Sequence, residues 1–243
     1  MKIQYLFSNH KGRDFVCGDI HGCFELLEQH LSEVSFQPHK DRLFSVGDLI
    51  DRGEDSALAL DYLKKKWFYC VRGNHEQMFL NWVMDPHSLF AYNAFYMHIH
   101  NGGGWVANYL NVPPQQLDFD IENGVDLHEK YPSLQLWVDA LKDLPYAIEI
   151  KSPVKTIGII HAEIPQDIKW SSLEAELHKF EIANSVLFSR KYIHTRKFYN
   201  YAIDGIDAIY CGHTIVEQVK HTGNIHYIDT GAYANKNLTL IEL

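Results

Sequence analysis

Short apolar segments alternate with longer amphipathic segments over the first hundred residues, and this alternation limits the possible folds more than any other feature. Strand-like apolar runs occur at residues 15–17, 43–46 and 68–71, and helical spacing of apolar residues occurs over 24–34, 56–67 and 76–83. A β-α-β-α-β order predicts parallel strands joined by right-handed crossovers. Ligands bind at the carboxyl ends of strands in such sheets, so the residues directly after each strand are the first candidates for function.

The rest of the chain divides into a helical part and a second set of strands. Residues 86–145 are rich in aromatic residues and are interrupted by Gly102-Gly103-Gly104 and Pro113-Pro114, which predicts a helical insertion or cap on the sheet. Further strands are predicted at residues 156–160, 208–211, 216–220, 225–228 and 238–241, with the last three forming an antiparallel meander. We expect an α/β fold in which residues 1–243 form one domain that contains the helical insertion.

Composition and charge exclude several classes of protein. The chain is 46% hydrophobic and 22% charged, which is typical of a globular protein. Its net charge of −9 argues against a nucleic-acid or membrane partner, because phosphate-rich surfaces attract basic faces. No apolar run approaches the ~18 residues of a membrane helix, and the N-terminal run is too short for a secretory signal. The four cysteines form no Cys-x-x-Cys pair. We expect a cytoplasmic, monomeric enzyme.

Five of the predicted strands are followed by Asp, Asn or His residues. The segments are Gly18-Asp19-Ile20-His21-Gly22, Gly47-Asp48-Leu49-Ile50-Asp51-Arg52-Gly53, Gly73-Asn74-His75-Glu76, His161-Ala162 and Gly212-His213. Carboxylates, imidazoles and an amide oxygen are ligands for divalent metals, and the mixture of nitrogen and oxygen without thiolate favours manganese, iron or zinc over calcium. The strand ends therefore predict a divalent-metal site.

At these residues the chain resembles the phosphoprotein phosphatase family of metallophosphoesterases, whose signature is GDxHG, GDxxDRG and GNHE followed by two later histidines. It is most similar to the bacteriophage lambda and bacterial serine/threonine phosphatases. Supporting segments are 71–78, Asn101-Gly102-Gly103-Gly104-Trp105, 227–232 and 237–241. The resemblance is loose between residues 106 and 145. It implies the calcineurin-like metallophosphoesterase fold, a central β-sandwich flanked by helices.

The resemblance also implies two divalent metal ions, manganese before iron or zinc, and a metal-bridging hydroxide that attacks phosphorus directly. The implied metal ligands are Asp19 and His21 for the first ion, Asp48 for both ions, and Asn74, His161 and His213 for the second. Two metals at ~3.5–4 Å separation suit this chemistry because they acidify a shared water and neutralise phosphate oxygens.

Acid catalysis and substrate binding are assigned by the same resemblance. His75 would be the general acid, oriented by Asp51. Arg52, Arg190 and Asn74 would bind the substrate, with Arg190 placed by the preceding run 186–189. A serine or threonine alkoxide is a poor leaving group, so a proton donor is worth ~10²–10⁴ in rate. A planar guanidinium matches a phosphate face better than an ammonium does.

The implied function is hydrolysis of phosphoserine or phosphothreonine in a protein or peptide, with phosphotyrosine as a further substrate. One alternative is hydrolysis of dinucleoside polyphosphates, but the related symmetrical hydrolases usually carry GNHD, whereas this chain has Glu76 and a complete Asp51-Arg52-Gly53. A second alternative is an inactive protein that binds phosphorylated partners. It predicts a missing ligand or acid, and none is missing.

Several other residues have simpler interpretations. We expect His98 and His100 to be surface or packing residues. Arg72 either contacts phosphate or, as we favour, forms a salt bridge behind the site. The glycines at 102–104 predict a loop near the cap rather than a dinucleotide site, because no apolar strand precedes them. Glu163 stands where the lambda-type pattern has Asp, which affects the rim of the site.

Overall fold

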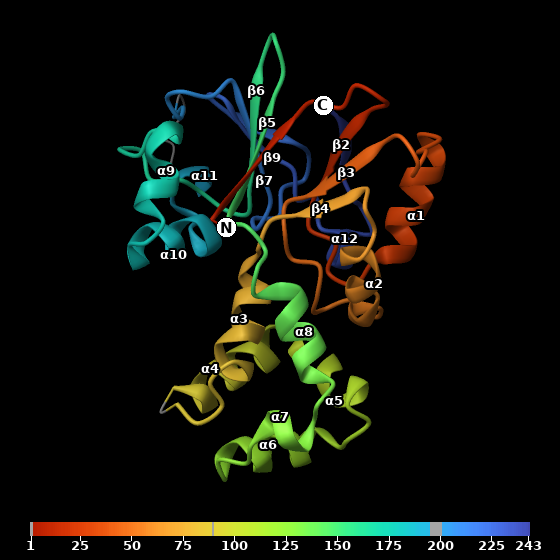
Figure 1. Cartoon of the computed structure of the whole chain (residues 1–243), viewed down its shortest axis with the longest axis vertical. Coiled ribbons are helices and arrows are strands. Elements are labelled where there is room, and N and C mark those ends of the chain that lie inside the picture. Colours follow the sequence, from red (N-terminus) through yellow and green to blue (C-terminus); the bar gives the residue numbers. More distant parts are fainter. Residues whose placement is uncertain (1, 89, 195–200) are drawn as a thin grey trace.

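The computed structural model describes residues 2–88, 90–194 and 201–243. Its strands are β1 (Ile3–Phe7), β2 (Asp14–Cys17), β3 (Arg42–Ser45), β4 (Phe68–Cys70), β5 (Ala147–Lys151), β6 (Thr156–Ile160), β7 (Ala208–Cys211), β8 (Lys220–Thr222), β9 (Ile225–Tyr227) and β10 (Leu240–Glu242). They form two sheets, one in the order β1-β5-β6-β7-β9-β8 and the other in the order β10-β2-β3-β4. The two sheets face each other as a sandwich (Figure 1).

Alternation of side chains along the strands explains why both faces of each sheet are covered. Val16 and Phe44 point between the sheets and pack with Ile148 and Ile159 of the opposite sheet. Their neighbours along the strands, such as Phe15, belong to a different apolar cluster, under the outer helices. Because successive side chains of a strand point to opposite faces, continuous apolar runs are required here.

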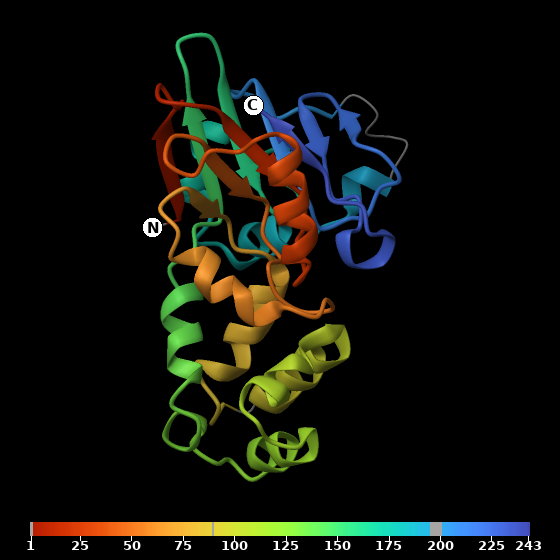
Figure 2. The ribbon, with the colours of Figure 1, turned by 90° about the vertical axis from the view of Figure 1, so that its right-hand side faces the viewer.

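Helices cover the outer faces of both sheets and one end of the sandwich (Figure 1 and Figure 2). They are α1 (Phe24–Glu33), η1 (Ser56–Leu58), α2 (Ala59–Leu63), α3 (Asn74–Val83), α4 (Ala91–His98), η2 (Ile99–Gly103), α5 (Trp105–Tyr109), α6 (Pro114–Glu122), α7 (Leu127–Lys130), α8 (Leu134–Leu141), α9 (Trp170–Glu176), α10 (Phe180–Phe188), α11 (Lys191–His194) and α12 (Ala232–Asn235). Figure 1 shows α1 and α2 outside the smaller sheet and α9, α10 and α11 outside the larger one. No described helix has the length and apolar character needed to cross a bilayer.

The helical segment 86–145 lies at one end of the sandwich, next to α3 (Figure 1 and Figure 2). Aromatic side chains join it to α3. The ring of Trp137 in α8 lies 4.7 Å from the ring of Trp105 and 6.0 Å from the ring of Phe79, which belongs to α3. These residues continue the apolar cluster under the smaller sheet. The helical segment therefore shares its core with the helix that follows β4.

The sandwich flanked by helices confirms the predicted fold class. Strands β2, β3 and β4 are parallel, as the alternation of strands and helices predicts. The helix predicted at 56–67 is shorter, ending at Leu63, and α3 begins earlier than predicted, at Asn74.

The predicted C-terminal meander is confirmed for its first pair, since β8 pairs antiparallel with β9, and is wrong for its third strand. Strand β9 pairs with β7 in parallel, and β10 leaves that sheet to pair antiparallel with β2. The predicted strand 216–220 contributes only its last residue, to β8. Strands β1 and β5 were not predicted. An apolar pattern predicts that a segment forms a strand, but it does not predict which strand it pairs with. Strand β10 pairs with β2 because that edge of β2 offers unpaired backbone N–H and C=O groups.

Candidate active site

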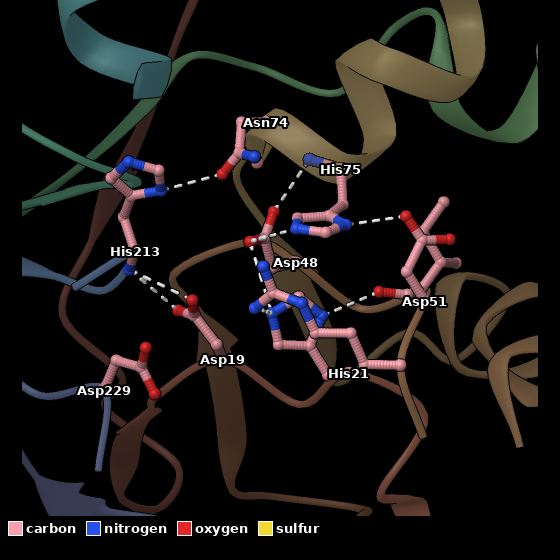
Figure 3. A network of polar contacts seen from close by, with 12 residues as sticks. Asp19, His21, Asp48, Asp51, Asn74, His75, His213 and Asp229 are labelled. Atoms are coloured by element: carbon pink, nitrogen blue, oxygen red, sulfur yellow. Dashed lines mark hydrogen bonds and ion pairs between the residues drawn. The ribbon is translucent and has the colours of Figure 1, made fainter. Parts of the chain in front are cut away.

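The ends of five strands deliver polar side chains to one place between the sheets (Figure 3). These residues are Asp19 and His21 after β2, Asp48 after β3, Asn74 and His75 after β4, His161 after β6 and His213 after β7. None of these residues is more than 7% exposed. Burial of this many polar groups is costly unless each has a partner, so their mutual geometry defines the site.

Asp48 is the centre of the cluster. Its Oδ2 lies 3.5 Å from Nε2 of His21 and 3.4 Å from Nε2 of His161. Its Oδ1 accepts the backbone N–H of His75 at 3.0 Å. Two groups of ligand atoms, each within 4.8 Å, share this carboxylate: one with His21 and His75, the other with His161 and His213. One carboxylate between two sets of donors is the arrangement expected of a bridging ligand.

Each of the three histidines predicted to bind metal is oriented by a backbone carbonyl outside the cluster. The pairs are Nδ1 of His21 with Ile50 at 2.8 Å, Nδ1 of His161 with Val46 at 2.8 Å, and Nε2 of His213 with Phe188 at 3.1 Å. A ring nitrogen facing a carbonyl carries the proton, so the other nitrogen of each ring presents its lone pair to the cluster. Burial lowers the pKa of His21 to about 3 and that of His213 to about 2, so both rings are neutral at pH 7.

The lone pairs of His161 and His213 converge on the amide oxygen of Asn74. Nε2 of His161 and Nδ1 of His213 each lie 2.8 Å from Oδ1 of Asn74. With the protons on the opposite ring nitrogens, these three atoms are all acceptors, so no hydrogen bond satisfies them. A cation would satisfy all three, and imidazole, amide and carboxylate are the donors that transition-metal cations accept. The residues present therefore fit a divalent metal ion.

The carboxylates of Asp19, Asp48 and Asp229 are all buried at this site, and together they favour the binding of a cation. Burial, followed by the neighbouring Asp229 and Asp48, raises the pKa of Asp19 well above its ordinary value. Burial also raises the pKa of Asp229 to about 6. Asp229 follows β9 and is only 2% exposed. The sequence analysis did not select it, although its position after a strand was the available signal.

His75 lies beside the cluster, with a carboxylate facing each of its ring nitrogens. Its Nδ1 lies 2.6 Å from Oδ2 of Asp51, and its Nε2 faces Oδ2 of Asp48 at 3.8 Å. Burial lowers the pKa of His75, but Asp48 and Asp51 raise it above its ordinary value. The imidazole therefore holds its second proton more tightly than a free histidine does, which suits a general acid.

Asp51 has further partners from the helical segment. Its Oδ1 accepts the indole N–H of Trp105 at 2.7 Å and lies 3.0 Å from Nε2 of His98. His98 is fully buried, as a packing residue is, but it is also bonded to the carboxylate of Asp51, which the sequence analysis did not predict. His100 is exposed, as predicted. Gly102, whose carbonyl accepts the N–H of Arg52 at 3.3 Å, places the predicted glycine loop beside the site.

Two arginines border the cluster. Nη1 of Arg52 lies 2.9 Å from Nε2 of His21, and its guanidinium lies 4.7 Å from the ring centre of Tyr233. Arg190 is exposed and donates from Nη2 to the carbonyl of His213 at 3.1 Å. The guanidinium groups of Arg52 and Arg190 are therefore both within reach of a group bound at the cluster.

Arg72 is turned away from the cluster. It donates to the side chain of Gln77 at 2.9 Å and to the carbonyl of Lys142, just past the end of α8. The described residues include no carboxylate paired with it, so the predicted salt bridge is replaced by these carbonyl and amide contacts. The carbonyls at a helix end carry partial negative charge, which attracts the guanidinium in the same way.

The backbone of the site is held in unusual conformations. Five residues of the site have φ between 45° and 74°: His21, Asp48, Asp51, Arg52 and His213. Residues other than glycine rarely adopt such values, and such strain is concentrated at functional sites. Glu76 supports the loop of Asp48 by accepting the N–H groups of Asp48 and Leu49 at 3.0 and 2.8 Å. A Cβ at Gly73 would overlap both Asp48 and Glu76, so glycine is required there.

Comparison with known proteins identifies the family. The profile of the calcineurin-like phosphoesterases matches residues 15–217. "Serine/threonine-protein phosphatase 1" of Salmonella typhimurium is 33% identical over 229 residues, which cover 94% of this chain and 91% of that protein. The chain therefore belongs to the calcineurin-like phosphoesterase family, a family of hydrolases, and the resemblance inferred from the motifs is confirmed.

Two further similarities involve proteins named for nucleotide hydrolysis. "Bis(5'-nucleosyl)-tetraphosphatase, symmetrical" of Pseudomonas fluorescens is 44% identical over 64 residues, only 26% of this chain and 22% of that protein. A solved structure described as a putative diadenosine tetraphosphatase matches with a TM-score of 0.64 and 20% identity, covering 100% of this chain and 97% of that one. The structural match shows the shared fold.

Proposed function

We propose that this protein is a metal-dependent phosphomonoesterase that hydrolyses phosphoserine and phosphothreonine in proteins, with phosphotyrosine as a further substrate. One observation carries the proposal: His75, held by Asp51 at 2.6 Å, presents Nε2 to a cluster of metal-ligand atoms centred on Asp48. A proton donor beside such a cluster is what cleavage of an alkyl phosphate ester requires.

The proposed ligand set uses the residues of the cluster. Asp19 and His21 would hold one metal ion, Asn74, His161 and His213 the other, and Asp48 both. Bound divalent ions, manganese first and iron or zinc as alternatives, would supply an acidified water and neutralise charge on the phosphate.

The chain's own residues would perform the remaining steps. Arg52 and Arg190, with the amide of Asn74, would bind and orient the phosphoryl oxygens. As water oxygen bonds to phosphorus and the bond from phosphorus to the serine or threonine oxygen breaks, His75 would pass the proton on Nε2 to that leaving oxygen. Asp51 would keep the proton on Nδ1 in place and stabilise the orientation of the ring.

The relative from Salmonella supports a protein substrate, since its name is that of a protein phosphatase and its similarity extends over nearly the whole chain. Glu76 supports the same choice, because the GNHE form of the motif distinguishes protein phosphatases from the symmetrical hydrolases in the resemblance described above. The second candidate is hydrolysis of dinucleoside polyphosphates, which the local match to the Pseudomonas protein favours. In either case we propose that the whole chain acts as one domain.

A kinetic comparison tests the proposal. The protein is stripped of metal, manganese is restored, and kcat/KM is measured for a phosphothreonine peptide and for diadenosine tetraphosphate. We expect a preference for the peptide that disappears on chelation and in Asp48→Asn, but persists in Asp143→Asn, whose side chain is exposed and belongs to none of the motifs. A preference for the dinucleotide would establish the second candidate in place of the first.

A further inference from the structure

His98 connects the helical segment 86–145 to the candidate proton donor. It is the last residue of α4 and is fully buried. Its ring lies between two partners: Nε1 of Trp82 is 3.2 Å from its Nδ1, and Oδ1 of Asp51 is 3.0 Å from its Nε2. Asp51 in turn binds His75 through its other oxygen. These side chains form a continuous line from α3 through α4 to the site.

The chemistry of Trp82 determines where the proton of His98 lies. An indole nitrogen can only donate, so Nδ1 of His98 must accept. In the neutral ring the proton is then on Nε2, which points it at Asp51. Trp82 therefore selects the tautomer in which His98 donates to the carboxylate.

Asp51 is surrounded by donors. Oδ1 faces His98 and the indole of Trp105, whereas His75 is the partner of Oδ2 among the residues that the structure describes. Burial raises the pKa of Asp51, but His98 and His75 lower it below its ordinary value, so the carboxylate stays ionised. Because two donors occupy Oδ1, the carboxylate cannot rotate without breaking their hydrogen bonds, and Oδ2 stays directed at His75.

Close packing fixes the ring of His98. Its ring centre lies 5.7 Å from that of Phe79 in an edge-on arrangement. A Cβ at Gly103 would overlap the imidazole, so the glycine loop closes directly over the ring. The orientation of Asp51 is therefore coupled to how α4 and the glycine loop pack on α3.

We propose that His98 is a positioning residue for acid catalysis: by holding Asp51, it holds His75 in the orientation that protonates the leaving group. This inference rests on the proposed phosphomonoesterase function. It differs from a purely structural role of His98 in one measurable respect. Loss of His98 should impair the hydrolysis of substrates whose leaving group needs a proton, and should spare substrates whose leaving group does not.

The experiment compares two substrates and three variants of the full chain with manganese bound. The substrates are a phosphothreonine peptide, whose alkoxide needs a proton, and p-nitrophenyl phosphate, whose phenolate does not. His98→Phe removes both ring hydrogen bonds, and His98→Gln retains an amide that can donate to Asp51 from the position of Nε2. His100→Phe is the matched control, because His100 is exposed two residues away.

We expect His98→Phe to lower kcat for the peptide at least about ten-fold and to leave kcat for p-nitrophenyl phosphate within about two-fold. His98→Gln should recover most of the peptide activity, and His100→Phe should match the unmodified protein on both substrates. In a His75→Asn background, His98→Phe should cause no further loss on the peptide, since residues that act through one group are not additive.

Three outcomes would overturn the inference. Equal losses on the two substrates would assign His98 a purely structural role, and unchanged peptide activity in His98→Phe would leave it no role. A further loss in the His75→Asn background would show that His98 does not act through His75. If His98→Phe does not fold, Trp82→Phe replaces it, because it removes the hydrogen bond to Nδ1 of His98; it must reduce peptide hydrolysis selectively, whereas His98→Gln must largely retain it. Unmodified protein that hydrolyses neither substrate would instead overturn the proposed function itself.

Discussion

At the scale of single residues, the site separates two kinds of histidine by what faces each ring. His21 and His213 donate to backbone carbonyls and have depressed pKa values, because burial outweighs the opposing charge of Asp48. His75 faces two carboxylates, and its pKa is raised above the ordinary value. The surroundings therefore suit the same side chain to the role of a neutral ligand in one place and to that of a proton donor in another.

His75→Asn should reveal the proton donor. Because asparagine has no proton to transfer, we expect kcat for a phosphothreonine peptide to fall ~10²–10⁴-fold. The rate with p-nitrophenyl phosphate should fall far less, since a phenolate leaves without protonation. His100→Asn is the matched control and should change neither rate. Similar losses on both substrates would contradict the role of His75 as general acid.

Glu163 organises the rim that carries Arg190. Its buried carboxylate accepts the hydroxyl of Ser189 at 2.7 Å and the N–H groups of Tyr192 and Ile193 at 3.0 and 2.9 Å. These residues flank Arg190 on both sides. The departure from Asp noted in the sequence is therefore a structural feature of the arginine's support.

Glu163→Gln should weaken phosphate binding through Arg190. The amide turns an acceptor oxygen into a donor facing other donors, so we expect the inhibition constant for inorganic phosphate to rise about five-fold and stability to fall by about 1–3 kcal/mol. The measurements are product inhibition and urea unfolding, with exposed Glu217→Gln as the control. In an Arg190→Gln background the effect on phosphate should vanish. An equal rise in that background would show that Glu163 does not act through Arg190.

At the scale of elements, one ion pair joins the loop before β2 to the turn before β3. Asp41, whose side chain is fully buried, accepts the N–H of Gln37 at 3.0 Å and both the N–H and the guanidinium of Arg13 at 2.9 and 2.8 Å. Burial raises the pKa of Asp41, but the bonds from Arg13 lower it below its ordinary value. A group of this kind stabilises the fold in a pH-dependent manner.

The contribution of Asp41 should disappear in acid. The unfolded carboxyl titrates near ~3.9, above the folded one, so the stabilisation is complete above that pH and is lost as pH falls through the folded pKa. We expect Asp41→Asn to be less stable than the unmodified protein by about 1–3 kcal/mol at pH 7. The difference should shrink towards ~pH 2. Urea unfolding at both pH values, with Asp143→Asn as control, measures it, and a constant difference would contradict the prediction.

At the scale of the whole molecule, the candidate metal ligands come from both sheets. Asp48 and Asn74 follow strands of the smaller sheet, whereas His161 and His213 follow strands of the larger one. A cation held by all four would link the two layers of the sandwich. Metal binding should therefore stabilise the fold as well as activate the site.

Removal of metal should lower the melting temperature. With manganese at ~100 times its dissociation constant, the stabilisation is about 2.7 kcal/mol, or roughly 5–10 °C for a chain of this length. Asp48→Asn should abolish most of the shift, and Asp143→Asn should preserve it. Elemental analysis should find two ions per chain. A count of one ion per chain, or a melting temperature that does not change on chelation, would contradict the two-metal proposal.

The sandwich class followed from the resemblance of the motifs to a known family, whereas the sequence by itself determined the order of strands and helices over residues 14–83 and the residues that meet at the strand ends. Local periodicity carries that information, because side-chain spacing reports which residues face a core, and the carboxyl ends of parallel strands must lie together. Asp19, Asp48 and His75 were therefore found before any contact was known.

Only the tertiary structure decided which distant segments touch. The contact of His98 with Asp51 spans 47 residues along the chain, and that of Trp105 spans 54. Strand β10 pairs with the open edge of β2 and not with the strands that directly precede β10 in the sequence. Nothing in the local pattern of such residues distinguishes a buried packing side chain from one that orients a catalytic group. The distinction arises when helices from the inserted segment pack on α3 and bring their polar atoms to Oδ1 of Asp51, whose other oxygen is bonded to His75.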